Sequence, residues 1–144
     1  MIEWSDKFEI GDELIDAQHR MLINYVNRLD DLSPAANPTP ETVELFFRFL
    51  EFLETYVLTH FKHEEDCMYR TRCPAHYENL KAHTEFLDFF QQFKRQVAVE
   101  GWRSELVDEL NDSCKAWIQR HILLIDRRLK YARLPSGSPS NGAP

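Results

Sequence analysis

Three histidines of this chain fall on the apolar faces that helical spacing predicts. His19 lies four residues after Ile15 and three before Leu22, so a helix would place all three side chains on one face. His83 and His121 are flanked by apolar residues at the same steps of three and four. A neutral imidazole is the commonest metal ligand in proteins. Because a buried polar group must be paired or costs free energy, several imidazoles gathered in one core predict a metal site.

A fourth histidine, His60, is followed one helical turn later by a carboxylate, Glu64. Counted from Leu53 at about 100° per residue, His60 lies at about −20° and Glu64 at about +20°, so both face the core. A buried carboxylate must be paired, protonated or bound to metal, and no lysine or arginine shares this stripe. A single buried histidine is usually a core residue with a hydrogen-bond partner, but four of them beside Glu64 favour a metal site.

The types of candidate ligand narrow the choice of metal. Imidazole and carboxylate without a neighbouring thiolate suit iron, manganese or zinc, and disfavour copper(I) and iron–sulfur clusters. Ferritin-like di-iron bundles carry two Glu-x-x-His pairs and further glutamates. This chain has only Asp16-x-x-His19. We therefore expect a centre that is rich in histidine and poor in carboxylate.

The elements that must position these residues are long amphipathic helices. Apolar periodicity predicts helices over about 12–32, from 39 or 41 to about 70, from about 74 to the break at Gly101, and over about 102–131. Leu80 and Leu87 on the third helix and Leu124 on the fourth are predicted core positions. No strand-like alternation occurs, and short connections imply antiparallel neighbours. The fold class is all-α, an up-down-up-down four-helix bundle.

The domain organisation follows from the same pattern. Residues 1–11 form an N-terminal arm whose Trp4, Phe8 and Ile10 are expected to pack on the bundle. Residues 12–133 form the bundle itself. The last residues, 134–144, are rich in proline, glycine and serine and predict a disordered tail or linker.

The composition excludes several classes of partner. The chain has 144 residues, enough for one domain, and a net charge of −7. That charge argues against nucleic acid, which needs a basic face, and against an anionic membrane surface. No apolar run approaches the roughly 20 residues of a membrane span, and no signal peptide is expected. The protein is therefore expected in the cytoplasm.

The cysteines fit a reducing compartment. Cys67, Cys73 and Cys114 are odd in number and have no framework spacing, which indicates thiols rather than disulfides. Cys67 and Cys73 lie close to the end of the second helix and could be redox-active, although structural thiols are commoner.

Four motifs in order, between Trp4 and Tyr131, resemble those of the hemerythrin family, in particular its bacterial hemerythrin-like domains. The motifs are Asp16-Ala-Gln-His19 on the first helix, His60-Phe-Lys-His-Glu64-Glu65 with Met68 on the second, Pro74 and His83 with Phe86 on the third, and Trp117-Ile-Gln-Arg-His121-Ile122 with Asp126 on the fourth.

The resemblance implies a non-haem centre of two iron ions, bridged by a glutamate, an aspartate and an oxo or hydroxo group, that binds dioxygen. It assigns the bridges to Glu64 and Asp126, one iron to His19 and His60, and the other iron to His83 and His121.

Asp126 is where simple geometry and the resemblance disagree. It lies five residues after His121, which is about 140° around an ideal helix. Both can reach one centre only if the helix is locally distorted, and a π-type turn is a known device at functional sites. We predict such a distortion between His121 and Asp126.

The resemblance also exposes a missing ligand. The family places two histidines four residues apart on the third helix, but Asn79 stands four residues before His83. The iron held by His83 and His121 is then expected to have an open or water-filled position. His76 lies about 10.5 Å along the helix from His83, too far to replace that ligand without unwinding. His63 is expected at the partly exposed edge of its helix.

These features favour a redox- or oxygen-sensing module over a reversible oxygen carrier or store. Reversible carriage needs one exchangeable position on the iron pair, and a second open position favours oxidation of the irons. A peroxide-handling enzyme and an iron-sequestering protein stay as alternatives. No general acid or base beyond the ligands stands out, so a binding module is favoured over an enzyme. The expected ligand is dioxygen or another small exogenous molecule. Some members of the family are fused to signalling domains such as diguanylate cyclases, so residues 134–144 could lead to such an output domain.

Overall fold

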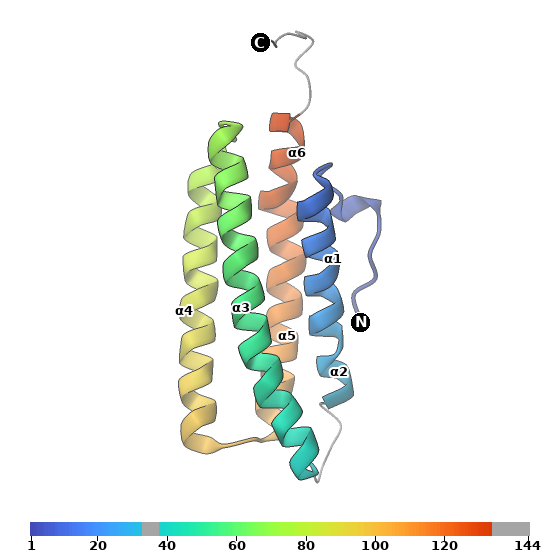
Figure 1. The fold of residues 1–144 in the computed structure, drawn as a ribbon, viewed down its shortest axis with the longest axis vertical. Coiled ribbons are helices and arrows are strands. Elements are labelled where there is room, and N and C mark those ends of the chain that lie inside the picture. Colours follow the sequence, from blue (N-terminus) through green and yellow to red (C-terminus); the bar gives the residue numbers. More distant parts are fainter. Residues whose placement is uncertain (33–37, 134–144) are drawn as a thin grey trace, which may run out of the picture.

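A computed structural model of the chain describes residues 1–32 and 38–133, which form an antiparallel bundle of four helical columns (Figure 1). The predicted all-α four-helix bundle is confirmed, and the described residues contain no strand. The predicted tail, residues 134–144, lies outside them. The elements are η1 (Asp6–Phe8), α1 (Glu13–Asn27), α2 (Leu29–Leu32), α3 (Pro40–Arg70), α4 (His76–Glu100), α5 (Ser104–His121), the π-helical turn η2 (Ile122–Asp126) and α6 (Arg127–Arg133).

The columns pack in a closed ring. The first column is α1 continued by α2, and the last is α5 continued by η2 and α6 (Figure 1). Helix α1 contacts α3 and α5, and α4 also contacts α3 and α5. Every column therefore has two neighbours, and one side of each faces a shared interior. Within the described residues, no helix is long and apolar enough to cross a membrane.

Local signals set most of the helix boundaries. The side chain of Asp12 accepts a hydrogen bond from the Ile15 amide at 3.0 Å and caps α1. Thr39 caps α3 in the same way, with Pro40 in the first turn. Gly101, with φ of 77°, ends α4. Two predicted boundaries were wrong in detail: a break at Arg28 separates α1 from α2, and α4 begins at His76 because residues 71–75 are needed to turn the chain.

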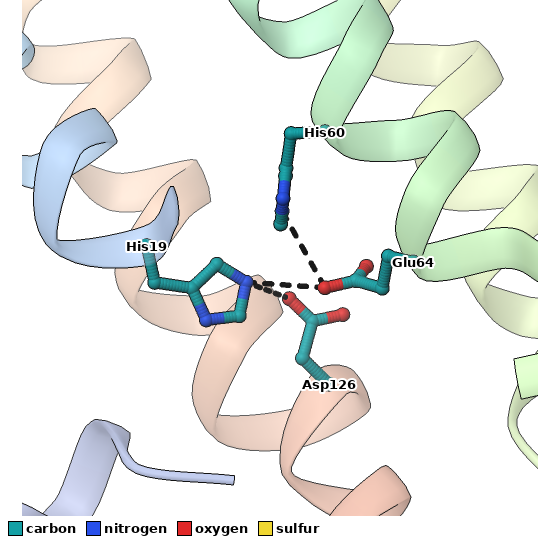
Figure 2. A group of neighbouring side chains, drawn as sticks. All are labelled: His19, His60, Glu64 and Asp126. Carbon is teal, nitrogen blue, oxygen red and sulfur yellow. Dashed lines mark hydrogen bonds and ion pairs between the residues drawn. The ribbon is translucent and has the colours of Figure 1, made fainter. Parts of the chain in front are cut away.

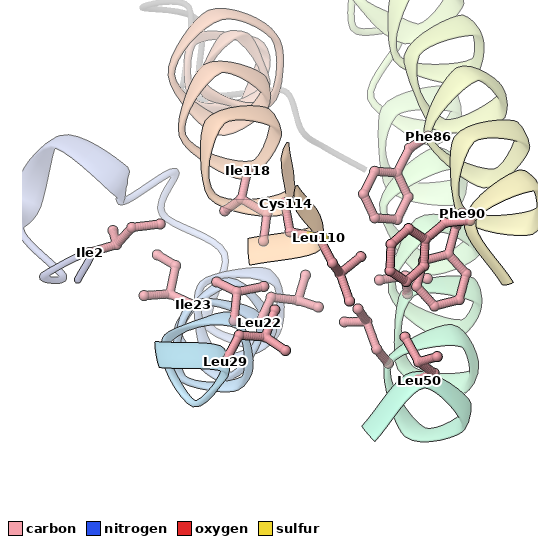
Figure 3. Close-up of a cluster of buried hydrophobic side chains, with 14 of the residues drawn as sticks. Ile2, Leu22, Ile23, Leu29, Leu50, Phe86, Phe90, Leu110, Cys114 and Ile118 are labelled. Carbon is pink, nitrogen blue, oxygen red and sulfur yellow. The ribbon is translucent and has the colours of Figure 1, made fainter. Parts of the chain in front are cut away.

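Two apolar clusters fill the interior. The larger cluster lies among all the columns and includes Leu22, Leu50, Phe90 and Cys114 (Figure 3). The smaller cluster is made of Ile10, Ile15, Cys67, Met68, Cys73, Ala75 and Leu129. We call this smaller set the upper cluster, because its residues come from around the start of α1, the end of α3, the turn before α4, and α6, which lie at the top of Figure 1.

Two predicted core positions, Leu80 and Leu124, were wrong, and Leu87 packs on the core only in part. Leu80 and Leu87 are only half-buried, because α4 turns Asn79, His83 and Phe86 toward the interior instead. Leu124 is 60% exposed, because it lies in the π-helical turn, where the face of the helix shifts.

The N-terminal arm packs against the bundle as expected. Phe8 and Ile10 are each 1% exposed, and Trp4 is partly buried. The carboxylate of Asp16 accepts hydrogen bonds from the amides of Ile10 at 2.9 Å and Gly11 at 3.1 Å. The aspartate of the first motif therefore anchors the arm beside the first helix.

Candidate metal centre

All four columns contribute to one buried group of histidines and carboxylates. None of the six predicted ligands is more than 4% exposed. They are His19 from α1, His60 and Glu64 from α3, His83 from α4, His121 from α5 and Asp126 from η2. The structure brings all six together, in two sets of four that share Glu64 and Asp126.

The first set, which we call site 1, consists of His19, His60 and one oxygen from each carboxylate (Figure 2). Nε2 of His19 lies 3.1 Å from Oε2 of Glu64 and 3.2 Å from Oδ2 of Asp126. Nε2 of His60 lies 3.4 Å from the same glutamate oxygen. Four potential ligand atoms therefore converge from α1, α3 and η2.

The second set, site 2, uses the other oxygens of the same carboxylates. Nε2 of His83 lies 3.1 Å from Oε1 of Glu64. Nε2 of His121 lies 2.9 Å from Oδ1 of Asp126 and 3.8 Å from Oε1 of Glu64. Each carboxylate thus turns one oxygen toward each site, which is the arrangement of a carboxylate that bridges two cations.

The π-helical turn explains how Asp126 reaches the centre. Residues Ile122–Asp126 form hydrogen bonds of the i→i+5 type, so this turn holds one residue more than an α-helical turn. The extra residue rotates Asp126 onto the side of His121 and buries it completely. The predicted distortion between His121 and Asp126 is confirmed.

The geometry of the close contacts suits cations better than hydrogen bonds. Neither oxygen of Asp126 has a partner with hydrogen-bond geometry in the described chain, although both lie near imidazole nitrogens. The Nε2 atoms of His83 and His121 are 3.0 Å apart, and at most a single proton can lie between them. In each set, the nitrogen and oxygen atoms lie within 4.8 Å of one another, as the ligands of one cation would. The donor set, four imidazole nitrogens and four carboxylate oxygens without a thiolate, fits iron.

Without a cation, the ionisable groups compensate one another. Burial lowers the pKa of His19, but its contacts with Asp126 and Glu64 outweigh burial and raise the pKa to about 10. The same opposition raises the pKa of His121 to about 9. Burial lowers the pKa of His60 to about 4. Burial alone would raise the pKa of Glu64, but the facing histidines, His60 foremost, hold it well below its usual value. The two carboxylates thus favour positive charge at this place, as they would favour a bound cation.

Two residues that hold the ligands in place were not predicted from the sequence. Nδ1 of His60 lies 2.8 Å from Oε1 of Gln18, and Nδ1 of His83 lies 2.6 Å from Oε2 of Glu65. Such partners fix the ring orientation of a ligating histidine and strengthen it as a donor. The sequence feature that could have indicated them is their position beside predicted ligands: Gln18 directly precedes His19, and Glu65 directly follows Glu64.

Aromatic rings also fix the imidazoles of site 2. Phe61 stacks on His83 with ring centroids 3.7 Å apart and planes within 5°. Trp117 stacks on His121 at 4.2 Å and 10°. Both rings therefore present Nε2 to the centre in a set orientation.

Asn79 lies on the buried face of α4, one turn before His83. It is 0% exposed, and neither polar atom of its side chain has a hydrogen-bond partner in the described chain. Leaving a buried amide unpaired is costly, so this position is poorly explained as ordinary core. His76, half-buried at the start of α4, lies near Tyr69 and is in neither ligand set. His63 is half-buried, as predicted.

The two sites have different surroundings. A small cavity of about 10 Å³ touches His19, His60, His121 and Asp126, and its remaining walls are apolar and aromatic: Leu22, Phe61, Trp117, Ile118 and Ile122. A larger groove of about 450 Å³ runs between α4 and the last column and reaches His121 from the surface. Its lining includes Glu78, Ala82, Glu85, Arg120 and Leu124.

Comparison with known proteins places this arrangement in a family. A profile of the hemerythrin HHE cation binding domain matches residues 10–132. The chain belongs to the hemerythrin family. Bacteriohemerythrin of Clostridium acetobutylicum is 26% identical over 127 residues, which span 88% of this chain and 97% of that protein. Bacteriohemerythrin of Pseudomonas aeruginosa is 28% identical over 120 residues, 83% of this chain and 72% of its own length. Myohemerythrin of Sipunculus nudus is 27% identical over 128 residues, 88% and 89%.

Proposed function

We propose that this chain is a non-haem di-iron protein that binds dioxygen, with His19 and His60 holding one iron, His83 and His121 the other, and Glu64 and Asp126 bridging them. The observation that carries the proposal is the split of each carboxylate, one oxygen toward each pair of histidines. A chain that merely buried polar groups would have no reason to divide them into two matched sets. A ferrous pair in this place supplies electrons that dioxygen can accept.

The cavity beside the centre favours a small neutral ligand. Its volume of about 10 Å³ is close to the minimum that accepts one water-sized molecule. Leu22, Phe61 and Ile118 line it with apolar surface, so a charged or strongly hydrated ligand loses solvation there. Dioxygen, which is small and uncharged, fits the polarity of this space.

Asn79 supports sensing rather than reversible carriage. An amide oxygen is a weaker iron ligand than imidazole, so site 2 has two histidines and a position open to solvent species or exogenous ligands. An open position at site 2, in addition to the one exchangeable position that carriage needs, favours net oxidation over release of intact dioxygen. The protein would then report dioxygen or redox state through the oxidation state of its irons. A signalling output domain joined through residues 134–144 stays a prediction, because those residues lie outside the described part of the chain.

Metal analysis combined with the optical spectrum tests the centre. We expect two irons per chain and the near-ultraviolet charge-transfer bands of a bridged diferric pair. One zinc ion per chain, without those bands, would overturn the di-iron proposal.

Stopped-flow oxidation of the reduced protein tests sensing against carriage. We expect rapid oxidation by dioxygen that purging with inert gas does not reverse. An oxygenated protein that persists and returns its dioxygen on purging would show a carrier or store instead.

A further inference from the structure

Cys67 and Cys73 lie on either side of the turn that ends α3 and belong to the same apolar cluster. Arg72 has a φ of 55°, and the amide of Cys73 donates a hydrogen bond to the Met68 carbonyl at 2.9 Å. This is the six-to-one hydrogen bond of a Schellman ending, in which the residue after the turn folds its side chain back over the last helical turn. Cys67 lies in that last turn. The backbone therefore directs the Cys73 side chain toward the segment that holds Cys67.

The surroundings agree with this placement. Both cysteines belong to the upper cluster and are 2% and 4% exposed. Burial is the main cause that raises the pKa of Cys73, and the nearby Cys67 raises it further. The two thiols thus share one dry compartment, and no disulfide joins them in the structure.

The upper cluster lies one helical turn from the metal centre. Met68 follows Glu64 by four residues, Ala75 precedes Asn79 by four, and Leu129 follows Asp126 by three. A helical turn rises about 5.4 Å. Asp126 is also close enough to influence the pKa of Cys73. The cysteine pair is therefore next to the layer of predicted ligands and on the side where Asn79 lies.

We propose that Cys67 and Cys73 are a redox pair that would be oxidised to a disulfide when dioxygen is reduced at the neighbouring site. The inference rests on the proposed function, which supplies dioxygen as the oxidant. The S–H bonds of both thiols break and one S–S bond forms. The two electrons and two protons released reduce one dioxygen to hydrogen peroxide. The disulfide would tie the end of α3 to the turn that begins α4, four residues or more before Asn79.

Burial is the reason that the centre, and not bulk solvent, is the oxidant. Oxidants in solution react with exposed thiolates. These two sulfurs are nearly inaccessible, and the raised pKa of Cys73 keeps its thiol protonated. Electrons that leave through the adjacent centre would spare the oxidant from having to reach the sulfurs.

Thiol counting on the full-length, iron-loaded protein tests the inference. The protein is reduced without oxygen, exposed to air, unfolded in an alkylating reagent and examined by mass spectrometry. We expect two of the three thiols to become protected, with a cross-link between the peptides that hold Cys67 and Cys73. Cys114 is an internal control, since it is 0% exposed and lies in the larger cluster (Figure 3). It is expected to stay alkylatable.

Matched variants and a metal-free sample separate the possible failures. Cys67→Ser and Cys73→Ser are expected to abolish the cross-link, and Cys114→Ser to leave it unchanged. Metal-free protein in air is expected to keep all three thiols. Equally fast protection without metal would overturn the coupling. Iron-loaded protein whose spectrum shows oxidation while both thiols stay alkylatable would overturn the inference and leave the di-iron function standing. Protein that binds no iron would overturn both.

Discussion

The two halves of the centre have the same ligands and different surroundings. Each half has two imidazoles and one oxygen from each of Glu64 and Asp126. At site 1, His60 is backed by the neutral amide of Gln18, and the small cavity touches both histidines, whereas at site 2 it touches only His121. At site 2, His83 is backed by the carboxylate of Glu65, and a surface groove reaches His121.

In the proposed centre, the residues that would hold the metals differ from the residues that would make the two sites react differently. The four columns fix the ligands nearly symmetrically, so the ligands alone would make two equivalent irons. The two sites differ in the residues around the ligands. Gln18 contacts a histidine of site 1, whereas Glu65 contacts a histidine of site 2. The surface groove and Asn79 lie on the side of site 2. A carboxylate behind an imidazole makes it a stronger donor. Glu65 therefore offsets part of what site 2 lacks in a third histidine.

Removing a shared bridge is expected to destroy both halves at once. Glu64→Ala takes one oxygen from each site and leaves four buried imidazoles with only Asp126 between them. We expect loss of both irons by metal analysis, with helical content by circular dichroism as a check of folding. Asp66→Ala, an exposed acid two residues further along α3, is the matched control and is expected to keep two irons. Loss of only one iron would show that Glu64 does not bridge.

Exchanging the residues behind the histidines is expected to move the two halves in opposite directions. Glu65→Gln is expected to weaken metal binding at site 2 by about 10- to 100-fold, the usual effect of losing such a partner. Gln18→Glu places a carboxylate behind His60 and is expected to strengthen site 1. Titration against a chelator of known affinity measures both. Weakening by Glu65→Gln of both sites equally would contradict an effect local to His83.

Restoring a histidine is expected to close site 2. Asn79→His is expected to slow air oxidation of the reduced protein about tenfold, which corresponds to ~1.4 kcal/mol in the barrier. Stopped-flow absorbance measures the rate. Asn79→Ala removes the amide without adding a ligand and is expected to oxidise like the native protein. A similar slowing in Asn79→Ala would show that the amide, and not an open position, controls the rate.

Removing the positive charge beside the groove is expected to have the smallest effect, and to change only the rate at which anions bind. Arg120 is an exposed cation on the groove that leads to site 2. Arg120→Gln is expected to slow azide binding to the diferric protein a few-fold at low salt, with the difference fading as salt screens the charge. Arg95→Gln, on α4 outside the groove, is the control. An equal effect of both variants would mean that net charge acts, not the groove.

Helical spacing alone predicted the residues of the proposed centre that follow the regular step, and the family resemblance was needed for the one that does not. His19, His60, Glu64, His83 and His121 follow the regular 100° step, so counting alone turned them inward. Asp126 breaks the step, and only the family resemblance assigned it to the centre. The same irregularity made the prediction for Leu124 wrong, because a regular helix would have buried it.

Side-chain contacts between different columns could not be predicted from the sequence, for a different reason. Gln18 meets His60 across α1 and α3, and Glu65 meets His83 across α3 and α4. Periodicity says which face of one helix is buried, but not which atoms on neighbouring helices touch. Periodicity likewise does not show that the buried Asn79 amide has no hydrogen-bond partner within the described residues, because that depends on the neighbouring columns.

The π-helical turn Ile122–Asp126 means that the metal centre is encoded in the count of residues as well as in their identity. Deleting a single residue there, such as the exposed Leu124, would let α5 run into α6 as one regular helix. The carboxylate would then follow His121 by four residues, as Glu64 follows His60, and would still face the interior. A regular helix of unchanged length, in contrast, would turn Asp126 about 140° away from His121.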